Sequence, residues 1–254
     1  MVIQSNSESV LLSANSLTKR FKQRTVLDHV DLTLERGHIY GLVGNNGAGK
    51  TTFMRIIMGL CFPTSGTISL FGQTGRRALE KQRKRIGALI EQPIAFSSMS
   101  ARKNLVLQRM LLDDPKKADI DTLLEIFGLS ESKVGKAAIS TFSLGMRQRY
   151  GLASALLGDP EFLVLDEPGT GLDPEGMRDL RNYLLTRNQE KGTTMLISSH
   201  ILSELVRVAT DFIILDHGKI IRTLTAAQLE AEQVEGQSID EYFLKLISPK
   251  ENNA

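Results

Sequence analysis

Apolar and polar residues alternate in two runs near the start of the chain. The runs cover residues 12–17 and 26–34, and the sequence Glu35-Arg36-Gly37 after the second run is typical of a turn. A period of two puts every second side chain on the same face of a strand, so that one face can pack on a core. We therefore predict that these runs form antiparallel strands in a small β layer.

Downstream, short apolar runs alternate with segments whose apolar residues have helical spacing. Strands are predicted at 39–43, 67–71, 162–165, 194–198 and 212–216, and helices at 51–58, 100–112, 120–127 and 146–157, with Asp113-Asp114-Pro115 as a break. Alternating strands and helices favour a mainly parallel sheet. The predicted fold class is therefore α/β, with an N-terminal antiparallel β subdomain and an inserted α-helical subdomain.

The same pattern divides one domain, 10–254, into segments. We assign 10–94 and 158–225 to the core, 95–157 to the inserted helices and 226–254 to a helical tail. The tail contains an apolar stripe at helical spacing, formed by Ile239, Tyr242, Phe243, Leu246 and Ile247. We expect this stripe to pack on the chain's own core, and contact with a membrane or a partner helix is the alternative.

Composition and charge set wider limits. The length of 254 residues and the hydrophobic content of 41% suffice for a large core, and the net charge of +2 does not favour nucleic acid as a partner. The basic run 76–85 is expected to be a solvated helix face, with a nucleic-acid patch as the weaker alternative. Cys61 is the one cysteine in the sequence, and we expect a small buried side chain without a disulfide, in a reducing cytosol.

The sequence also bears on membranes. Residues 1–9 are polar and lack the apolar core of a signal peptide, and no uninterrupted apolar run approaches the roughly 20 residues that cross a bilayer. We therefore expect that the chain does not span a membrane. If it works in transport, another polypeptide must form the pathway.

The sequence Gly44-Asn45-Asn46-Gly47-Ala48-Gly49-Lys50-Thr51-Thr52 follows the predicted strand 39–43 directly and predicts a phosphate-binding loop. The helix after it would point free N–H groups and the positive end of its dipole at the loop, where anions bind. The glycines let the backbone wrap around a phosphate, Lys50 supplies a charge to the β and γ oxygens, and the Thr51 hydroxyl can ligate Mg²⁺. A glycine-rich turn that only caps the helix is the alternative.

A second motif supports the phosphate site. The strand 162–165 ends in Asp166-Glu167-Pro168, which is the Walker B arrangement that complements a phosphate loop. Successive strand residues point to opposite faces, so the chain must bend after Asp166 for both acids to serve one site. We predict that Asp166 holds Mg²⁺ through its water shell and that Glu167 accepts the proton of the water attacking the γ-phosphate. Solvated acids at a strand end are the alternative for this motif by itself.

With the segment Phe-Ser-Leu-Gly-Met-Arg-Gln-Arg at 142–149, the chain resembles the nucleotide-binding subunit of an ABC transporter over residues 12–225. That family has Leu-Ser-Gly-Gly-Gln, a basic residue and Gln-Arg at this signature. Ser143 and Gly145 match, whereas Leu144 and Met146 replace the family's Gly and Gln. The resemblance implies that this segment meets the γ-phosphate held by a second subunit, through the Ser143 hydroxyl and the N–H groups of the helix that follows.

Two further positions match the family. His200 follows the predicted strand 194–198 and resembles the switch histidine, which contacts the γ-phosphate and helps to hold the attacking water. Gly171-Leu172-Asp173 resembles the D-loop that crosses the dimer interface, which implies that Asp173 takes part in coupling.

The resemblance also implies contacts with the nucleotide base. Phe21 falls where the family has an aromatic residue that stacks on adenine, and Val26 is a further predicted ATP contact. Stacking of a base on such a ring contributes about 1–3 kcal/mol in single-strand binders. The alternative is a Phe21 side chain packed under the β layer.

The Q-loop departs most from the family. Counting from Ile86-Gly87 puts Glu91 where the family has the glutamine that ligates Mg²⁺ and connects the core to the helical subdomain, and Gln92 follows it. A carboxylate is still a hard oxygen ligand, but it cannot donate a hydrogen bond. Either residue remains a candidate for this role.

This glutamate, the Ser-Leu-Gly-Met signature and the ending 239–247 are similar to a subfamily that exports, or confers immunity to, lantibiotics and bacitracin-like peptides. The resemblance implies a subunit that binds and hydrolyses MgATP and dimerises head to tail, most simply with a copy of itself. It implies a separate transmembrane permease, which would carry the peptide without direct contact with this chain. The expected location is the cytoplasmic face of a bacterial membrane, with no nucleic-acid partner.

Two other functions stay open. Soluble ABC-type ATPases that act on ribosomes or DNA usually carry two cassettes in one chain or a long coiled-coil insertion, and this sequence has neither. A non-catalytic nucleotide-binding regulator is disfavoured by Glu167 and His200. Measurable ATP hydrolysis that disappears in Glu167→Gln would decide against the regulator.

Overall fold

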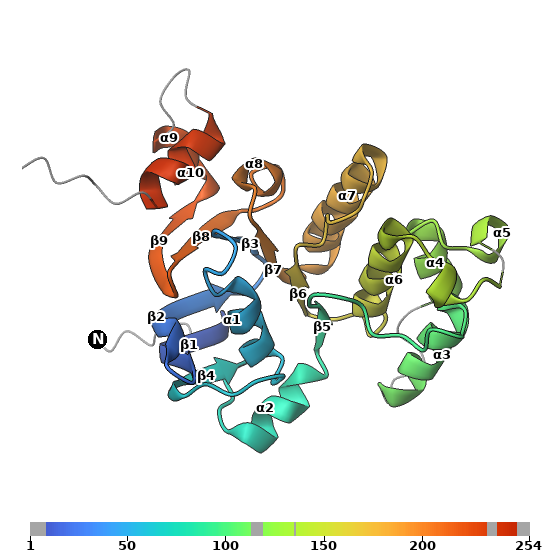
Figure 1. Ribbon diagram of the computed structural model, residues 1–254, viewed down its shortest axis with the longest axis horizontal. Coiled ribbons are helices and arrows are strands. Elements are labelled where there is room, and N and C mark those ends of the chain that lie inside the picture. The colour runs from blue at the N-terminus through green and yellow to red at the C-terminus, as the bar shows by residue number, and fades with distance from the viewer. Residues whose placement is uncertain (1–8, 113–118, 135, 233–237, 248–254) are drawn as a thin grey trace, which may run out of the picture.

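The computed structural model describes residues 9–112, 119–134, 136–232 and 238–247. These residues form two sheets, helices around them and a separate group of helices to one side (Figure 1). The predicted break at 113–115 and the end of the predicted tail lie outside the described residues.

The smaller sheet is the N-terminal layer. It contains β1 (Val10–Phe21), β2 (Arg24–Glu35) and β4 (Ser65–Leu70) in the order β2-β1-β4, and β1 pairs antiparallel with both neighbours. The alternating residues Leu12 and Ala14 of β1 are buried, as are Leu32 and Leu34 of β2. The prediction of an antiparallel layer is confirmed. The strands extend beyond the alternating runs because the pairing continues through irregularities in register.

The larger sheet has the strand order β5-β6-β7-β3-β8-β9 within the described residues. Its strands are β3 (Ile39–Val43), β5 (Ile86–Leu89), β6 (Phe162–Asp166), β7 (Thr194–Ser199), β8 (Asp211–Asp216) and β9 (Lys219–Thr225). All neighbours pair in parallel except β8 and β9, which are antiparallel. Because parallel strands end at the same edge, the loops after β3, β6 and β7 gather there.

Strand β9 was not among the predicted strands. Most of its residues are exposed or half-buried, and of its apolar side chains Leu224 is the one that is fully buried. Its sequence therefore lacks the continuous apolar run typical of the central strands. Its place at the edge of the sheet depends on its hairpin with β8.

The larger sheet has a separate apolar core on each face. On one face, Leu42 and Val164 belong to a cluster with Phe53 of α1 (Lys50–Ile57) and with the N-terminal sheet. On the other face, Ile197 belongs to a cluster with Leu184 of α7 (Pro174–Lys191) and with α8 (Leu202–Leu205). Burial on both faces explains why β3, β6 and β7 are apolar along their whole length.

The inserted helices lie beside the core (Figure 1). They are α3 (Ala101–Leu111), α4 (Ile120–Ile126), α5 (Glu131–Val134), a 3-10 turn at Ile139–Thr141 and α6 (Leu144–Leu156). The side chains of Ser100, Asp119 and Ser143 cap α3, α4 and α6 by accepting hydrogen bonds from backbone N–H groups. These caps explain why polar residues stand directly before the apolar helical patterns.

The basic run forms α2 (Arg76–Arg83) and the turn after it. Arg77 and Lys81 are exposed, as predicted for a solvated face. Two other arginines have structural contacts instead. Arg83 is half-buried and donates to the Ile57 carbonyl at 2.8 Å, and Arg85 donates to Glu161 at 2.6 Å.

The C-terminal stripe packs on the chain's own core from Ile239 to Leu246, as predicted. It lies on α10 (Ile239–Ile247), which follows α9 (Ala226–Glu232), and Tyr242 and Phe243 belong to the same apolar cluster as α8. Cys61 is half-buried rather than fully buried, and this partial burial raises the pKa of its thiol. Within the described part of the chain, no helix has the length and apolar character needed to cross a membrane.

Candidate functional site

The phosphate loop connects β3 to α1. Gly49 precedes the helix with φ +116°, and a Cβ at this position would lie 2.9 Å from the Val26 carbonyl oxygen and 2.8 Å from Leu27 Cδ2. Glycine is therefore required both by the backbone conformation and by the close approach of β2. Lys50 is buried, and its Nζ donates to the Gly44 carbonyl at 2.5 Å, which holds the ammonium group inside the loop.

The loop encloses a cavity of about 290 Å³. Its lining residues are Arg24, Val26, Asn45, Asn46, Gly47, Gly49, Lys50, Thr51, Thr52, Asp166 and Glu167. The structure thus brings together the predicted ATP residues of the loop, Val26 and both acids of the Walker B motif. Ala48, although part of the loop, is buried beneath it.

Asp166 and Thr51 meet at the base of this cavity. Thr51 Oγ1 donates to Asp166 Oδ2 at 2.7 Å, and Ser198 Oγ of β7 donates to Asp166 Oδ1 at 2.6 Å. The hydroxyl and the carboxylate are both hard oxygen donors, which suit Mg²⁺ when water and phosphate oxygens supply the remaining ligands. The described residues contain no group of three or more His, Cys, Asp or Glu side chains that could hold a metal by themselves.

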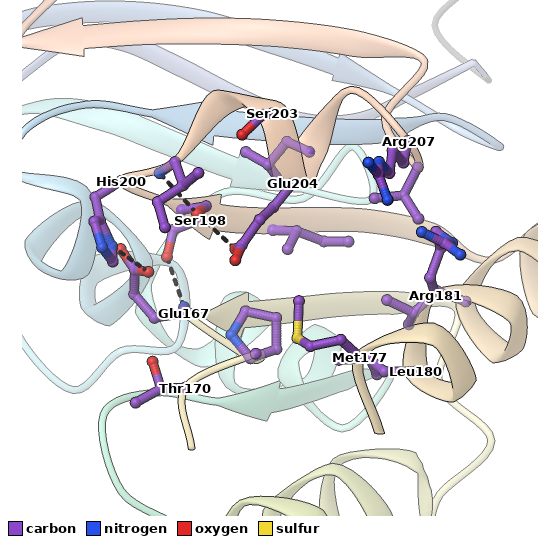
Figure 2. A pocket seen from close by; sticks show the side chains of 18 of the residues that line it. Glu167, Thr170, Met177, Leu180, Arg181, Ser198, His200, Ser203, Glu204 and Arg207 are labelled. Atoms are coloured by element: carbon purple, nitrogen blue, oxygen red, sulfur yellow. Dashed lines mark hydrogen bonds and ion pairs between the residues drawn. The ribbon is translucent and has the colours of Figure 1, made fainter. Parts of the chain in front are cut away.

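Glu167 is turned toward the same cavity by a bend in the backbone. Its φ is +47°, which is the left-handed region and uncommon outside glycine. This is the bend that the sequence requires if both acids serve one site. One carboxylate oxygen, Oε1, lies 3.6 Å from Lys50 Nζ. The other, Oε2, lies 2.8 Å from His200 Nδ1 (Figure 2).

The conformation of Glu167 is held by two neighbouring elements. Its backbone N–H donates to Ser198 Oγ at 2.9 Å. Gln148 of α6 is buried and donates through Nε2 to the Glu167 carbonyl at 3.2 Å and to the Pro168 carbonyl at 3.0 Å. The signature helix is therefore connected directly to the backbone of the predicted catalytic acid.

The signature segment begins α6 and packs against the D-loop. Ser143 Oγ accepts from Met146 N at 3.2 Å, and Leu144 is 60% exposed. A Cβ at Gly145 would lie 2.5 Å from the Gly171 carbonyl oxygen, so the helix start and the D-loop touch through their backbones. Asp173 caps α7 and accepts from Arg149 Nη2 at 2.9 Å. None of the four signature residues lines the phosphate cavity of the described chain.

Phe21 lies at the end of β1, across the hairpin from Arg24. Its side chain is 47% exposed, with Lys19 Nζ 4.7 Å from the centre of its ring. This exposure argues against the alternative that Phe21 packs under the β layer. Phe21 is not among the residues that line the phosphate cavity, so base stacking stays a prediction.

Glu91 and Gln92 lie outside the phosphate cavity as well. Glu91 has φ +60° and accepts from Arg55 Nη2 of α1 at 2.5 Å, whereas Gln92 lines a groove between the core and α3. The two candidates therefore point to different surroundings, and neither lines the cavity that contains the predicted metal ligands Thr51 and Asp166. Which of them serves as the Q-loop residue stays a prediction.

The model of the family described as ABC transporter matches residues 27–170. The chain belongs to the ABC transporter family. The bacitracin transport ATP-binding protein BcrA of Enterococcus faecalis is 37% identical over 86% of this chain and 70% of its own length. The lantibiotic transport ATP-binding protein SrtF of Streptococcus pyogenes is 39% identical over 92% of this chain and 96% of its own length. A solved ATP-binding subunit of an ABC transporter is 29% identical with a TM-score of 0.82, covering 93% of this chain and 99% of that one.

Within this ABC ATP-binding subunit, three contacts were not predicted from the motifs. Arg24 lines the phosphate cavity, Ser198 joins both acids, and Gln148 holds the backbone after β6. Ser198 stands two residues before the matched His200, but its side chain could not be assigned to Asp166 without the register of β6 and β7. Arg24 carries no comparable local signal, and Gln148 belongs to the matched Gln-Arg of the signature, which does not indicate that its side chain reaches the backbone after β6.

Proposed function

We propose that this chain is the ATP-hydrolysing subunit of a bacterial transporter that exports peptide-like antimicrobial compounds. The observation that carries hydrolysis is the position of the Glu167 carboxylate, which lies at the edge of the phosphate cavity between Lys50 and His200. The proposed cargo rests on the similarity to the bacitracin and lantibiotic transport proteins.

Each residue of the site has a distinct proposed role. Lys50 and the loop N–H groups bind the β- and γ-phosphates, and Thr51 and Asp166 hold Mg²⁺, which would neutralise charge on the phosphates. Glu167 accepts a proton from the attacking water, and His200 orients that carboxylate through the contact at 2.8 Å. We retain Glu91 or Gln92 as the Q-loop residue that approaches this site when the helical subdomain moves.

The signature segment supports a composite site with a second ATP-binding subunit, most simply another copy of this chain. Ser143 and Leu144 are exposed, and the start of α6 offers backbone N–H groups to an anion. Because these residues do not line the chain's own phosphate cavity, they can complete a nucleotide site only in a partner subunit. The contact between Gly145 and the D-loop would transmit the binding of the partner's nucleotide to Glu167.

We propose that the permease docks in the groove between the core and the helical subdomain. This groove has a volume of about 440 Å³ and is lined by Leu60, Ile94, Phe96 and Leu111 among other residues. Ile94 is 93% exposed and Leu111 is 80% exposed, which is unusual for apolar side chains gathered around one groove. Docking there would place the subunit at the cytoplasmic face of the membrane and connect the permease to the Q-loop.

ATP turnover tests the catalytic part of this proposal. We expect Glu167→Gln to keep MgATP binding and to lower kcat about 10²- to 10⁴-fold, because the proton acceptor is lost and the shape is kept. Glu125→Gln removes an exposed carboxylate on α4 and should leave turnover unchanged. Equal turnover in the wild type and in Glu167→Gln would refute the assigned role.

Copurification from membranes tests the partner. A wild-type chain should copurify with an integral membrane polypeptide, and Ile94→Glu should reduce that association at least tenfold while leaving MgATP binding intact, because it puts a charge into an apolar contact. Lys103→Glu also changes the charge of an exposed residue, but on α3 outside the groove, and serves as the control. A chain that stays in the soluble fraction and sediments with ribosomes would contradict the transport function.

A further inference from the structure

A second cavity lies on the other side of Glu167. It has a volume of about 680 Å³ and is bounded by α7, by α8 and by the ends of β6 and β7 (Figure 2). Its lining residues and those of the phosphate cavity have one described residue in common, which is Glu167. The two cavities are therefore neighbours, and the Glu167 side chain is part of the wall between them.

At Glu167 this boundary includes a polar contact. Glu167 Oε2 and His200 Nδ1 are 2.8 Å apart, and both side chains are partly exposed. Such a contact can open by side-chain rotation, without repacking of the core.

The far end of the second cavity carries uncompensated positive charge. Arg181 of α7 and Arg207 after α8 line it, and neither forms an ion pair or a side-chain hydrogen bond within the described residues. In Figure 2 both guanidinium groups lie at the end away from Glu167 and His200. Arg178 also lines the cavity, but it has Glu175 and Asp179 within 3.7 and 3.9 Å.

Two unpaired guanidinium groups in a partly enclosed cavity create a positive potential that attracts anions. Glu204 is a further charged group on this cavity, and it accepts a hydrogen bond from Ser199 at 3.4 Å nearer to His200. The walls of the cavity include the apolar side chains of Met177, Leu180 and Ile197. The arrangement suits the passage of a small anion toward the arginines better than its tight binding midway.

We propose that this cavity is the release path for inorganic phosphate after hydrolysis. The proposal rests on the proposed ATPase function. Hydrolysis forms a bond between the water oxygen and the γ-phosphorus and breaks the bond to the bridging oxygen of ADP, and the proton of the water passes by way of Glu167 to the phosphate or to solvent. ADP still occupies the phosphate loop, so the phosphate dianion leaves past the opened Glu167–His200 contact, drawn toward Arg181 and Arg207.

A single-turnover experiment on the full-length chain tests this path. ADP formation is followed by chemical quench, and free phosphate by a fluorescent phosphate-binding reporter. We expect the double variant Arg181→Gln/Arg207→Gln to form ADP at the wild-type rate but to release phosphate about tenfold more slowly, since the steering potential is lost. The delay between the two signals is the measured quantity. The delay should be shorter in Arg181→Lys/Arg207→Lys than in Arg181→Gln/Arg207→Gln, because the lysines keep the positive charges.

The matched control is Arg77→Gln/Lys81→Gln, which removes two positive charges from the exposed face of α2, outside the cavity. It should release phosphate like the wild type. The proposal would be overturned if Arg181→Gln/Arg207→Gln released phosphate with the same delay as the wild type. An equal slowing of ADP formation and phosphate release would also overturn it. A wild-type chain that forms no ADP would instead contradict the proposed ATPase function.

Discussion

The side chain of Ser198 offers the sharpest test of how the site is built. It is fully buried at the end of β7, donates to Asp166 Oδ1 at 2.6 Å and accepts from the Glu167 backbone N–H at 2.9 Å. One hydroxyl therefore positions the predicted metal ligand and the predicted proton acceptor. We predict that Ser198→Ala damages catalysis, although Ser198 itself touches neither ATP nor water in the proposed mechanism.

The expected magnitude follows from the two hydrogen bonds. A hydrogen bond to a charged group contributes about 1.5–3 kcal/mol, and a buried donor left without a partner costs about 1–3 kcal/mol. Because the two terms share one atom and are not additive, we expect the free energy of unfolding to fall by about 2–4 kcal/mol. If about half of this loss appears in the transition state, kcat should fall roughly 10-fold, since 1.4 kcal/mol corresponds to tenfold in rate.

The assay compares kcat, KM for ATP and denaturant unfolding in the wild type, Ser198→Ala and Ser199→Ala. KM should stay within about twofold because the Lys50 loop does not contact Ser198. Ser199 is also buried, but it bonds to Ile201 N and Glu204 and not to Asp166 or Glu167, so its variant controls for the loss of a hydroxyl. A kcat for Ser198→Ala equal to that of Ser199→Ala would refute the positioning role.

Three further predictions concern other parts of the molecule. Gly145→Ala should lower ATP turnover by at least about tenfold, measured at saturating ATP, because its Cβ would lie 2.5 Å from a D-loop carbonyl oxygen and force the two segments apart; unchanged turnover would show that the contact is dispensable. Glu91→Ala should depress ATP turnover more than Gln92→Ala if Glu91 is the metal-side residue of the Q-loop, and the reverse order would reject that assignment. The Arg85 hydrogen bonds hold the pKa of Glu161 below its usual 4.5. The pair therefore stabilises the fold fully above pH 4.5, and this stabilisation is lost as the pH falls through the lowered pKa. In denaturant unfolding, Arg85→Ala should lower the free energy of unfolding by about 0.5–1 kcal/mol at pH 7 and by less at pH 3, because Glu161 is half exposed.

Much of the site could be predicted because its chemistry lies in short contiguous segments. The glycine spacing of the phosphate loop, its lysine and the strand before it identify an anion site from nine residues, and the paired acids after 162–165 identify its complement. The requirement for a bend at Glu167 also follows from the sequence, since neighbouring strand residues point to opposite faces. The bend appears as a left-handed backbone at this residue.

The edge strand β9 and the contacts of the Q-loop residues could not be predicted from the sequence. An exposed edge strand has little apolar patterning, so its sequence resembles a loop. The sequence names Glu91 and Gln92 as candidates, but their contacts depend on α1 and α3, which come from other parts of the chain. Local pattern cannot tell which of two adjacent side chains faces the nucleotide.

The sequence by itself determined the class of fold and the family and predicted the residues that bind phosphate, because periodicity and motif spacing are properties of neighbouring residues. The tertiary structure decided how those residues cooperate: Ser198 reaches both acids, Gln148 connects the signature helix to Glu167, and α7 and α8 enclose a charged cavity behind it. These contacts join residues that are distant in the chain. They depend on strand order, on the register of β6 with β7 and on helix packing, all of which are set by burial of the two apolar cores and not by any short segment.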